Sequence, residues 1–268
     1  MSGTPRPVPI LMYHAIGRCP SPAARRLSVS PEAFAEQLDM LDDGGFTPLT
    51  TTELAHAWRS GDALPRRPVL ITFDDGYEGV HRHALPLLTA HGFAATLFVS
   101  TGWLRGECPA GDAPDTMLDW GQVRDLAAAG TEIGGHSHSH PHLDRVGDRR
   151  LRFETLRCKE IIAAELGLPP ASFAYPYGHS SRRVRRAVRA AGFAQSLAVG
   201  NALAMRRQGP YALERLTVRR STGREEFGRL IEGRGLLRAF AGDRALTKGY
   251  AVVRRASQAR RKVTGSRV

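Results

Sequence analysis

Short apolar runs of strand-like composition alternate with segments of helical periodicity along most of this 268-residue chain. Strands that alternate with helices pair in parallel, because a crossover helix returns the chain to the same end of the sheet. The pattern therefore predicts an α/β fold on a parallel sheet, either open or closed into a barrel. The seven runs cover residues 10–14, 69–73, 95–99, 131–134, 172–175, 195–199 and 213–218.

Helical signals are clearest in four of the segments between these runs. After Ser30, Pro31 suits the first turn of a helix, and apolar residues then follow at helical spacing. Three further amphipathic segments end at Gly130, Gly167 and Gly192, and glycine is the residue that most often terminates a helix. We therefore predict four helices at these places.

Polar residues that can carry out chemistry follow several of the runs at their carboxyl ends. They are His14, Asp74, Asp75, His136 and Tyr177. Barrels of β/α units gather their catalytic groups at this end, which favours a barrel, although an open doubly wound sheet would place a site there too. The sequence has no Gly-x-Gly-x-x-Gly after the first run and no Walker loop, which weighs against a nucleotide-binding fold.

Two segments of the chain supply the ligand types of a divalent metal site. Asp74 and Asp75 are adjacent carboxylates, and histidines occur at 136, 138, 140 and 142. An Asp and two His with an open coordination position describe a hydrolytic centre of the zinc type, and a second Asp is then free to act as a base. Taken separately, Asp-Asp-Gly suits a turn and the histidines suit a solvated loop. Their joint occurrence favours the metal site.

The spacing of the histidines narrows the choice of ligands. His136 and His140 are four residues apart, which places them on one face of either a strand or a helix. His138 shares that face on a strand, but Pro141 predicts a loop or a helix start near His140. We expect His138 and His142 to lie outside the ligand set.

Four motifs, in order along the chain, resemble those of one family. Ile-Thr-Phe-Asp-Asp-Gly-Tyr at 71–77 resembles the first motif of the polysaccharide deacetylases, the NodB homology domain or carbohydrate esterase family 4. Gly-His-Ser-His-Ser-His-Pro at 135–141 resembles the His-Ser/Thr-x-x-His motif, and Phe-Ala-Tyr-Pro-Tyr-Gly at 173–178 is similar to Arg-x-Pro-Tyr-Gly. Pro-Ile-Leu-Met-Tyr-His at 9–14 resembles the opening of the subgroup that deacetylates poly-N-acetylglucosamine and related glycans.

The resemblance covers residues 8–230 and implies a single catalytic domain there, folded as a NodB-like distorted (β/α)7 barrel. It implies Asp74 as the general base and His14 as the general acid that protonates the amine leaving group. A metal ion and the backbone N–H of Tyr177 would hold the oxyanion. The implied metal ligands are Asp75, His136 and His140.

The chain departs from the family pattern at two places. Ala174 stands where the family has an arginine that contacts the catalytic Asp, so the tuning of Asp74 must come from elsewhere or activity is reduced. No Asp-Trp or Leu-x-His motif follows Gly178. We interpret Trp120, which precedes the histidine motif, as a packing residue on the preceding helix.

The resemblance implies a metal-dependent hydrolase that removes N-acetyl groups from an N-acetylhexosamine in a glycan, glycolipid or other glycoconjugate. Zn is the expected metal, with Co, Ni or Mn as alternatives. Two other functions stay open: an O-acetyl esterase on an acetylated sugar, and a basic binding homologue with little activity. The intact metal ligands argue against the second. No specific nucleic-acid partner is predicted, because no reading motif accompanies the arginines.

The formal charge of +12 is concentrated near the C-terminus, where residues 219–268 carry 14 Lys and Arg against 4 Asp and Glu. We interpret residues 233–268 as a basic, amphipathic extension that could contact an anionic membrane. The first residues lack the apolar core of a secretory signal, no run reaches the about 18 apolar residues of a membrane span, and the scattered cysteines imply no disulfide framework. The expected location is the cytoplasm, with peripheral contact at the inner membrane face.

Overall fold

The computed structural model describes residues 6–18, 20–105 and 113–242 of the chain. Its strands form one sheet in the order β7-β6-β5-β4-β3-β1-β8, with β2 paired to β3 off this path, and every pairing is parallel. The strands are β1 (Ile10–Tyr13), β2 (Thr47–Pro48), β3 (Pro68–Phe73), β4 (Thr96–Val99), β5 (Glu132–Gly135), β6 (Ser172–Ala174), β7 (Gln195–Leu197) and β8 (Leu216–Thr217).

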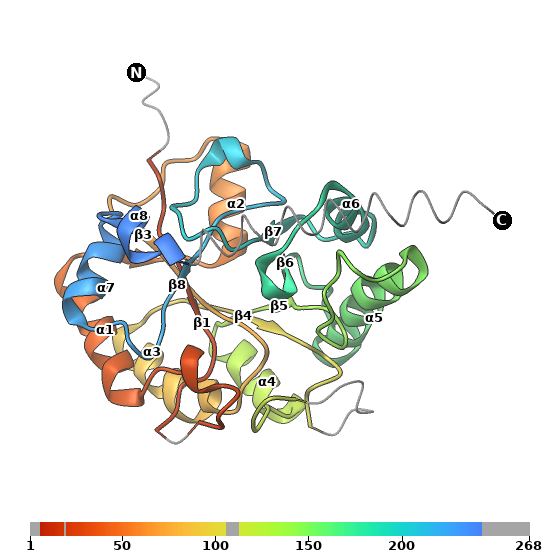
Figure 1. Cartoon of the computed structure of the whole chain (residues 1–268), viewed down its shortest axis with the longest axis horizontal. Coiled ribbons are helices and arrows are strands. Elements are labelled where there is room, and N and C mark those ends of the chain that lie inside the picture. The colour runs from red at the N-terminus through yellow and green to blue at the C-terminus, as the bar shows by residue number, and fades with distance from the viewer. Residues whose placement is uncertain (1–5, 19, 106–112, 243–268) are drawn as a thin grey trace.

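Helices surround this sheet, with α1, α3 and α7 on one side of the molecule and α5 and α6 on the other (Figure 1). They are α1 (Pro31–Asp43), α2 (Thr51–Ser60), α3 (Leu85–His91), α4 (Trp120–Ala128), α5 (Asp148–Leu166), α6 (Arg182–Ala190), α7 (Arg224–Ile231) and α8 (Leu236–Ala239). Short helical turns complete the set: η1 (Arg25–Leu27), η2 (Val80–Ala84), η3 (Pro176–Gly178) and η4 (Arg206–Gln208).

The run at 213–217 brings the two edges of the sheet together. Leu213 forms a β-bridge with Leu197 of β7, and Leu216 pairs with Leu11 of β1. One short segment therefore pairs with both β7 and β1, so the sheet curves into a barrel with a thin seam. The prediction of a distorted β/α barrel is confirmed.

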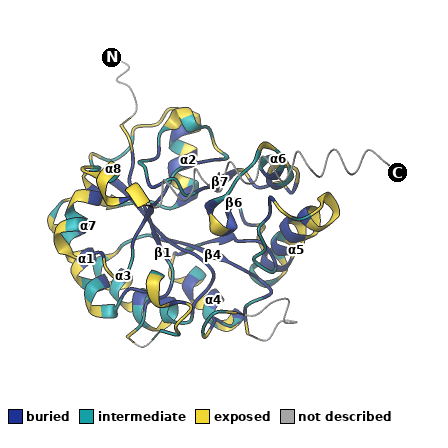
Figure 2. Cartoon of the chain, viewed as in Figure 1, coloured by how far each residue is buried: buried dark blue, intermediate teal, exposed yellow. Residues whose placement is uncertain are grey.

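Alternation along the strands separates the barrel interior from the face that the helices cover. Ile10 and Leu70 pack inward in one apolar cluster, while their neighbours pack outward in a second cluster with the helices. All six positions of β3 are buried for this reason, and buried residues run along the strands in Figure 2. Continuing the inward alternation leads from Ile10 to His14 and from Leu70 to Asp74. These two polar residues therefore reach the interior at the carboxyl ends of β1 and β3.

The predicted helices are found with their expected end signals. Ser30 caps α1 by accepting from the N–H of Ala33, and α5 ends at Gly167, which has a φ of 74°. Trp120 begins α4 and is buried in the core, in line with a packing role. Two longer helices, α2 and α7, were not predicted, although Thr50 starts α2 with a capping box.

The first residues after position 233 pack against the barrel domain. Phe240, which is 2% exposed, packs with Leu216 of β8 and Leu230 of α7. Residues 243–268 of the expected extension lie outside the described part of the chain, so the extension stays a prediction. Among the described helices, none has the length and apolar character needed to cross a membrane.

Candidate metal centre and catalytic pocket

A cavity of about 500 Å³ opens at the carboxyl ends of the strands. All six residues to which the sequence assigned a role line it, although their chain positions span 164 residues. They are His14, Asp74, Asp75, His136, His140 and Tyr177. The structure therefore brings the predicted residues to one place, while the role of each remains a prediction.

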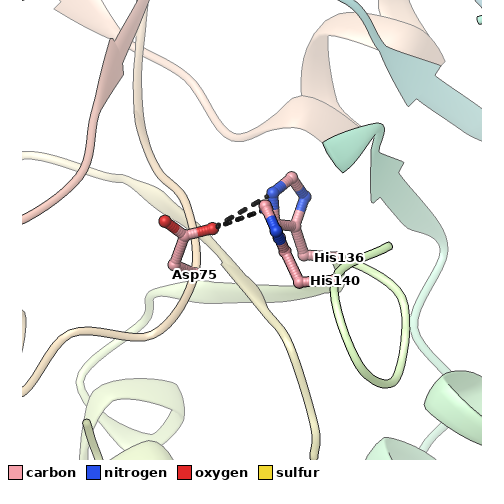
Figure 3. Close-up of side chains that lie close together, drawn as sticks. All are labelled: Asp75, His136 and His140. Atoms are coloured by element: carbon pink, nitrogen blue, oxygen red, sulfur yellow. Dashed lines mark ion pairs between the residues drawn. The ribbon is translucent and has the colours of Figure 1, made fainter. Parts of the chain in front are cut away.

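Three of these residues form a cluster that fits a divalent cation. Oδ1 of Asp75 lies 3.3 Å from Nε2 of His136 and 3.2 Å from Nε2 of His140, as Figure 3 shows. This carboxylate oxygen is buried and has no hydrogen-bond partner among the described residues. One carboxylate oxygen and two imidazole nitrogens turned toward a common point are a typical zinc ligand set, so the residues present fit such an ion.

The hydrogen bond of His136 prepares its ring for metal binding. Nδ1 of His136 lies 2.8 Å from the carbonyl oxygen of Ala174, which places the ring proton on Nδ1 and leaves the lone pair of Nε2 facing Asp75. The ring of His140 stacks on Trp103, with 4.4 Å between the ring centroids. Both rings are therefore held in orientation by neighbours outside the cluster.

The charges of the cluster also shift the pKa values of its members. Burial would raise the pKa of Asp75, but its close contacts with His140 and His136 hold it well below its ordinary value. Burial would lower the pKa of His136, but Asp74 and Asp75 raise it above its ordinary value. The carboxylate is accordingly ionised and ready to bind a cation at neutral pH.

Unusual backbone conformations deliver these side chains. Asp75, Ser137, His140 and Tyr177 have φ values of 76°, 67°, 55° and 59°, in the left-handed region that non-glycine residues seldom adopt. Each costs about 1–3 kcal/mol and persists only where the surroundings enforce it. His136 and His140 thus converge through a loop with two left-handed residues, and not through a shared strand or helix face as their spacing suggested.

Glu154 of α5 holds that loop in place. Its fully buried carboxylate accepts from the backbone N–H of His138 at 3.0 Å and of Ser139 at 2.7 Å, and from Oγ of Ser139 at 2.7 Å. The side chain of His138 contacts Oγ1 of Thr101 at 2.9 Å and lies outside the metal cluster. Sequence reasoning missed Glu154, whose only signal was an acidic residue on the buried face of a helix.

The second carboxylate, Asp74, is paired with an arginine from the opposite end of the sequence. Nη1 and Nη2 of Arg215 donate to Oδ1 and Oδ2 of Asp74 at 2.6 and 2.7 Å, and both side chains are buried. Burial would raise the pKa of Asp74, but the charges of Arg215 and His136 outweigh burial and hold it below its ordinary value. Asp74 is therefore an ionised carboxylate beside the metal cluster, with its Oδ2 3.9 Å from Nε2 of His136.

Arg215 supplies the arginine contact to Asp74 that the family pattern places at position 174. Ala174 packs in the barrel interior and contributes no charge, while Arg215 reaches the same carboxylate from just before β8. Sequence reasoning included Arg215 in an apolar run without assigning it a role. The available signal was an arginine in a run that is otherwise mostly buried.

The remaining two residues lie on either side of the metal cluster. His14 is half-buried, and its removal from water lowers its pKa against the opposing charges of Asp75 and Asp74. Tyr177 lies in the η3 turn, and its ring stacks on His142 at a centroid distance of 3.8 Å. Gly178 must follow it, because its φ is 69° and a Cβ there would lie 2.4 Å from Cβ of Val199.

A family model described as polysaccharide deacetylase matches residues 61–196, a little over half of the chain and the part that carries the metal cluster. The chain belongs to the polysaccharide deacetylase family. Members of this family are hydrolases that remove acetyl groups, and this chain is accordingly assigned to that enzyme class. The expected family and enzyme class are confirmed.

Similar proteins support the assignment, and the matches cover different shares of the two chains compared. This deacetylase is 28% identical to YxkH of Bacillus subtilis (strain 168) over 228 residues, which is 85% of this chain and 77% of that protein. It is 25% identical over 194 residues to the poly-beta-1,6-N-acetyl-D-glucosamine N-deacetylase of Escherichia coli (strain K12), covering 59% of this chain but 29% of that protein.

Among solved structures, the deacetylase PplD of Streptococcus pyogenes in complex with acetate superposes with a TM-score of 0.76. The two chains are 24% identical, and the match covers 85% of this chain and 99% of PplD. At this identity the likeness shows a shared fold, and it agrees with the barrel described above.

Proposed function

We propose that this chain is a divalent-metal-dependent de-N-acetylase that acts on an N-acetylhexosamine in a glycan or glycoconjugate. The observation that carries the proposal is the cluster of Asp75, His136 and His140 beside a separate, arginine-bound carboxylate in one cavity. The poly-beta-1,6-N-acetyl-D-glucosamine N-deacetylase of E. coli supports an acetamido sugar as the substrate class.

Asp75, His136 and His140 would hold the metal, and Zn suits one carboxylate and two imidazoles, with Co, Ni or Mn as alternatives. A bound divalent ion would polarise the acetyl carbonyl and lower the pKa of water toward about 7. Oδ1 of Asp75 is the shared contact of the two rings, so this residue is central to binding.

Asp74 is suited to act as the general base. Its carboxylate is ionised through Arg215, so it can take a proton from the attacking water while the oxygen of that water bonds to the acetyl carbon. Arg215 is fully buried in the barrel wall, and its paired contacts fix the plane of the carboxylate. Base and metal ligand are therefore neighbours in sequence with different electrostatic partners.

His14 is placed to supply the proton that the leaving nitrogen needs when the carbon–nitrogen bond breaks. Burial lowers the pKa of His14, which makes its imidazolium a stronger acid while leaving a smaller protonated fraction at neutral pH. The backbone N–H of Tyr177 would bind the oxyanion of the tetrahedral intermediate. The products are acetate and a free amino sugar.

Acetate release from a panel of substrates tests the proposal. The panel holds neutral N-acetylglucosamine oligosaccharides and O-acetylated sugars of matched length, each assayed after chelation and after addition of Zn, Co, Ni or Mn. Metal-dependent release from the N-acetylated members is expected. Release confined to the O-acetylated members would replace the proposal with an O-acetyl esterase, and no release from either class would contradict both.

A further inference from the structure

Asn201 is the only asparagine of the chain, and it lines the catalytic cavity. It lies four residues after β7, and its backbone N–H donates to the carbonyl oxygen of Arg215 at 3.0 Å, which ties it to the segment before β8. The residue is 5% exposed. A polar side chain that is so nearly buried has a fixed position in the cavity wall.

Two hydrogen bonds fix the orientation of its side-chain amide. Oδ1 of Asn201 accepts from the backbone N–H of Thr217 at 3.0 Å and from Oγ1 of Thr217 at 2.9 Å. A backbone N–H can only donate, so the amide oxygen, and not the nitrogen, faces Thr217. Nδ2 makes no hydrogen bond within the described part of the chain and is not sealed off from solvent, so its two N–H groups face the cavity.

The local structure explains the position of this residue but not its amide nitrogen. Asn201 has a φ of 51°, in the left-handed region that Gly, Asn and Asp adopt at the lowest cost. An aspartate would suit this backbone and would accept both hydrogen bonds from Thr217. The feature that only asparagine adds is an N–H donor. A nearly buried donor is costly to leave unpaired, so its partner is expected among the molecules that enter the cavity.

The order of the strands places Asn201 on the leaving-group side of the proposed reaction. Around the barrel, Asp75 and His136 follow β3 and β5, His14 follows β1, and β8 and β7 come next. The acetyl carbonyl would lie at the metal ligands and the leaving nitrogen at His14. The sugar ring is attached to that nitrogen, so it extends past His14 toward β8 and β7, where Thr217 and Asn201 line the cavity.

We infer that Nδ2 of Asn201 donates a hydrogen bond to a hydroxyl oxygen of the acetylated sugar, on the leaving-group side of the bond that breaks. A hydroxyl oxygen accepts through two lone pairs, so it is a suitable partner for an amide N–H. Asn201 thereby favours acetylated sugars over acetyl compounds that lack a sugar. The inference rests on the proposed deacetylase function and identifies a residue that recognises its substrate.

The kinetic test removes the donor from the enzyme and the acceptor from the sugar. Asn201→Gly removes the amide and keeps a residue suited to the left-handed backbone. The sugars are the methyl glycoside of N-acetylglucosamine and its 3-deoxy, 4-deoxy and 6-deoxy analogues, each of which lacks one hydroxyl. In the wild type, kcat/KM for acetate release should be about tenfold lower on at least one analogue than on the parent glycoside, and that difference should disappear in Asn201→Gly.

Two controls separate sugar recognition from damage to the site. Gln208→Ala removes another amide between β7 and β8 that does not line the cavity, so it should keep the wild-type ratio of parent to analogue. Turnover of an activated aryl acetate, which has no sugar, should stay the same in Asn201→Gly. Equal penalties for every deoxy analogue in the wild type and in Asn201→Gly would overturn the inference and leave the deacetylase in place.

A binding measurement decides the case in which Asn201→Gly does not fold or no sugar is hydrolysed. Because the chain has one asparagine, labelling with ¹⁵N-asparagine gives a single side-chain NH2 group in the NMR spectrum. The probe is the methyl glycoside of glucosamine with a methanesulfonamide in place of the acetamide, which cannot release acetate. Its addition to the zinc-loaded wild type should shift the side-chain NH2 signals more than the backbone N–H signal of Asn201, which is already bonded to Arg215. Side-chain signals that do not move at saturation would overturn the inference, whether or not the chain is a deacetylase.

Discussion

At the scale of single residues, the most informative contact is the buried pair of Arg215 and Asp74. Two carboxylates stand next to each other in the sequence, yet one faces two imidazoles and the other faces a guanidinium. Their environments thus divide the work between binding a metal and taking a proton. A buried pair of this kind is costly to break, at about 3–5 kcal/mol when one partner is removed.

Replacing Arg215 should move the pH dependence of the reaction. In Arg215→Met, Asp74 stays buried without its cation, so its pKa rises and the base is deprotonated only at higher pH. The acid limb of the pH profile of kcat/KM should therefore shift to higher pH. Arg215→Lys keeps the positive charge but loses the paired hydrogen bonds to Asp74, so it should shift the acid limb less. Metal content measured on the same samples separates this effect from loss of the ion. An unchanged acid limb would show that Arg215 does not tune the base.

Removing one metal ligand should abolish metal binding and turnover together. His140→Ala would leave a carboxylate and one imidazole, too few protein ligands for a stable open site. Elemental analysis and acetate release measure the two properties. His142→Phe is the control, because it retains a ring stacked on Tyr177 and lies outside the cluster. Full metal occupancy in His140→Ala would reject the ligand assignment.

The role of His14 can be read from the leaving group. An amine leaves poorly without a proton, whereas the phenolate of an activated aryl acetate leaves unaided, so His14→Ala should lose about 10²–10⁴-fold on the amide and much less on the ester. The measurement is kcat on both substrates with the same enzyme preparation. An equal loss on the two would assign His14 a structural role.

At the scale of elements, α5 contributes more than packing, because Glu154 binds the loop that carries both histidines. In Glu154→Gln, an amide that donates and cannot accept replaces one oxygen, and it must either leave both backbone N–H groups on Oε2 without an acceptor or replace the acceptor Oε1 of the Ser139 hydroxyl. Metal affinity should fall about 10–100-fold, as for other residues that orient ligands. A chelator competition titration measures it, with the exposed Glu160→Gln on the same helix as the control. Equal affinities in both variants would mean that the loop holds its shape without Glu154.

The elements also show what the sequence could and could not predict. The seven runs were recognisable because most of their residues are buried and many are apolar, as in β3, where all six positions are buried. The two-residue strand β2 has too few residues to show a period. The convergence of His136 and His140 depends on left-handed residues at 137 and 140, and neither is a glycine. No periodic pattern of residues encodes that geometry, so only the resemblance of the histidine motif to the family motif predicted that His136 and His140 come together.

At the scale of the whole molecule, closure of the barrel places residues from both ends of the chain in one site. The segment at 213–217 joins β7 to β1, and Arg215 on that segment reaches Asp74. A partner that is 141 positions away in sequence could be found only once the barrel closes. The same closure explains why Phe240, beyond the predicted catalytic domain, packs under β8.

The basic C-terminal extension can be tested by truncation, and the packing of Phe240 determines where the shortened chain should end. Residues 243–268 carry eight Lys and Arg against one Asp, and basic residues near an anionic bilayer are worth about 1 kcal/mol each. A chain ending at Gly242 keeps Phe240 and should retain turnover on a soluble sugar while losing affinity for anionic vesicles. Co-sedimentation at low salt with anionic and with neutral vesicles measures this. If both lengths sediment equally with anionic vesicles, the binding surface lies within residues 1–242; if neither does, the membrane-contact hypothesis is wrong.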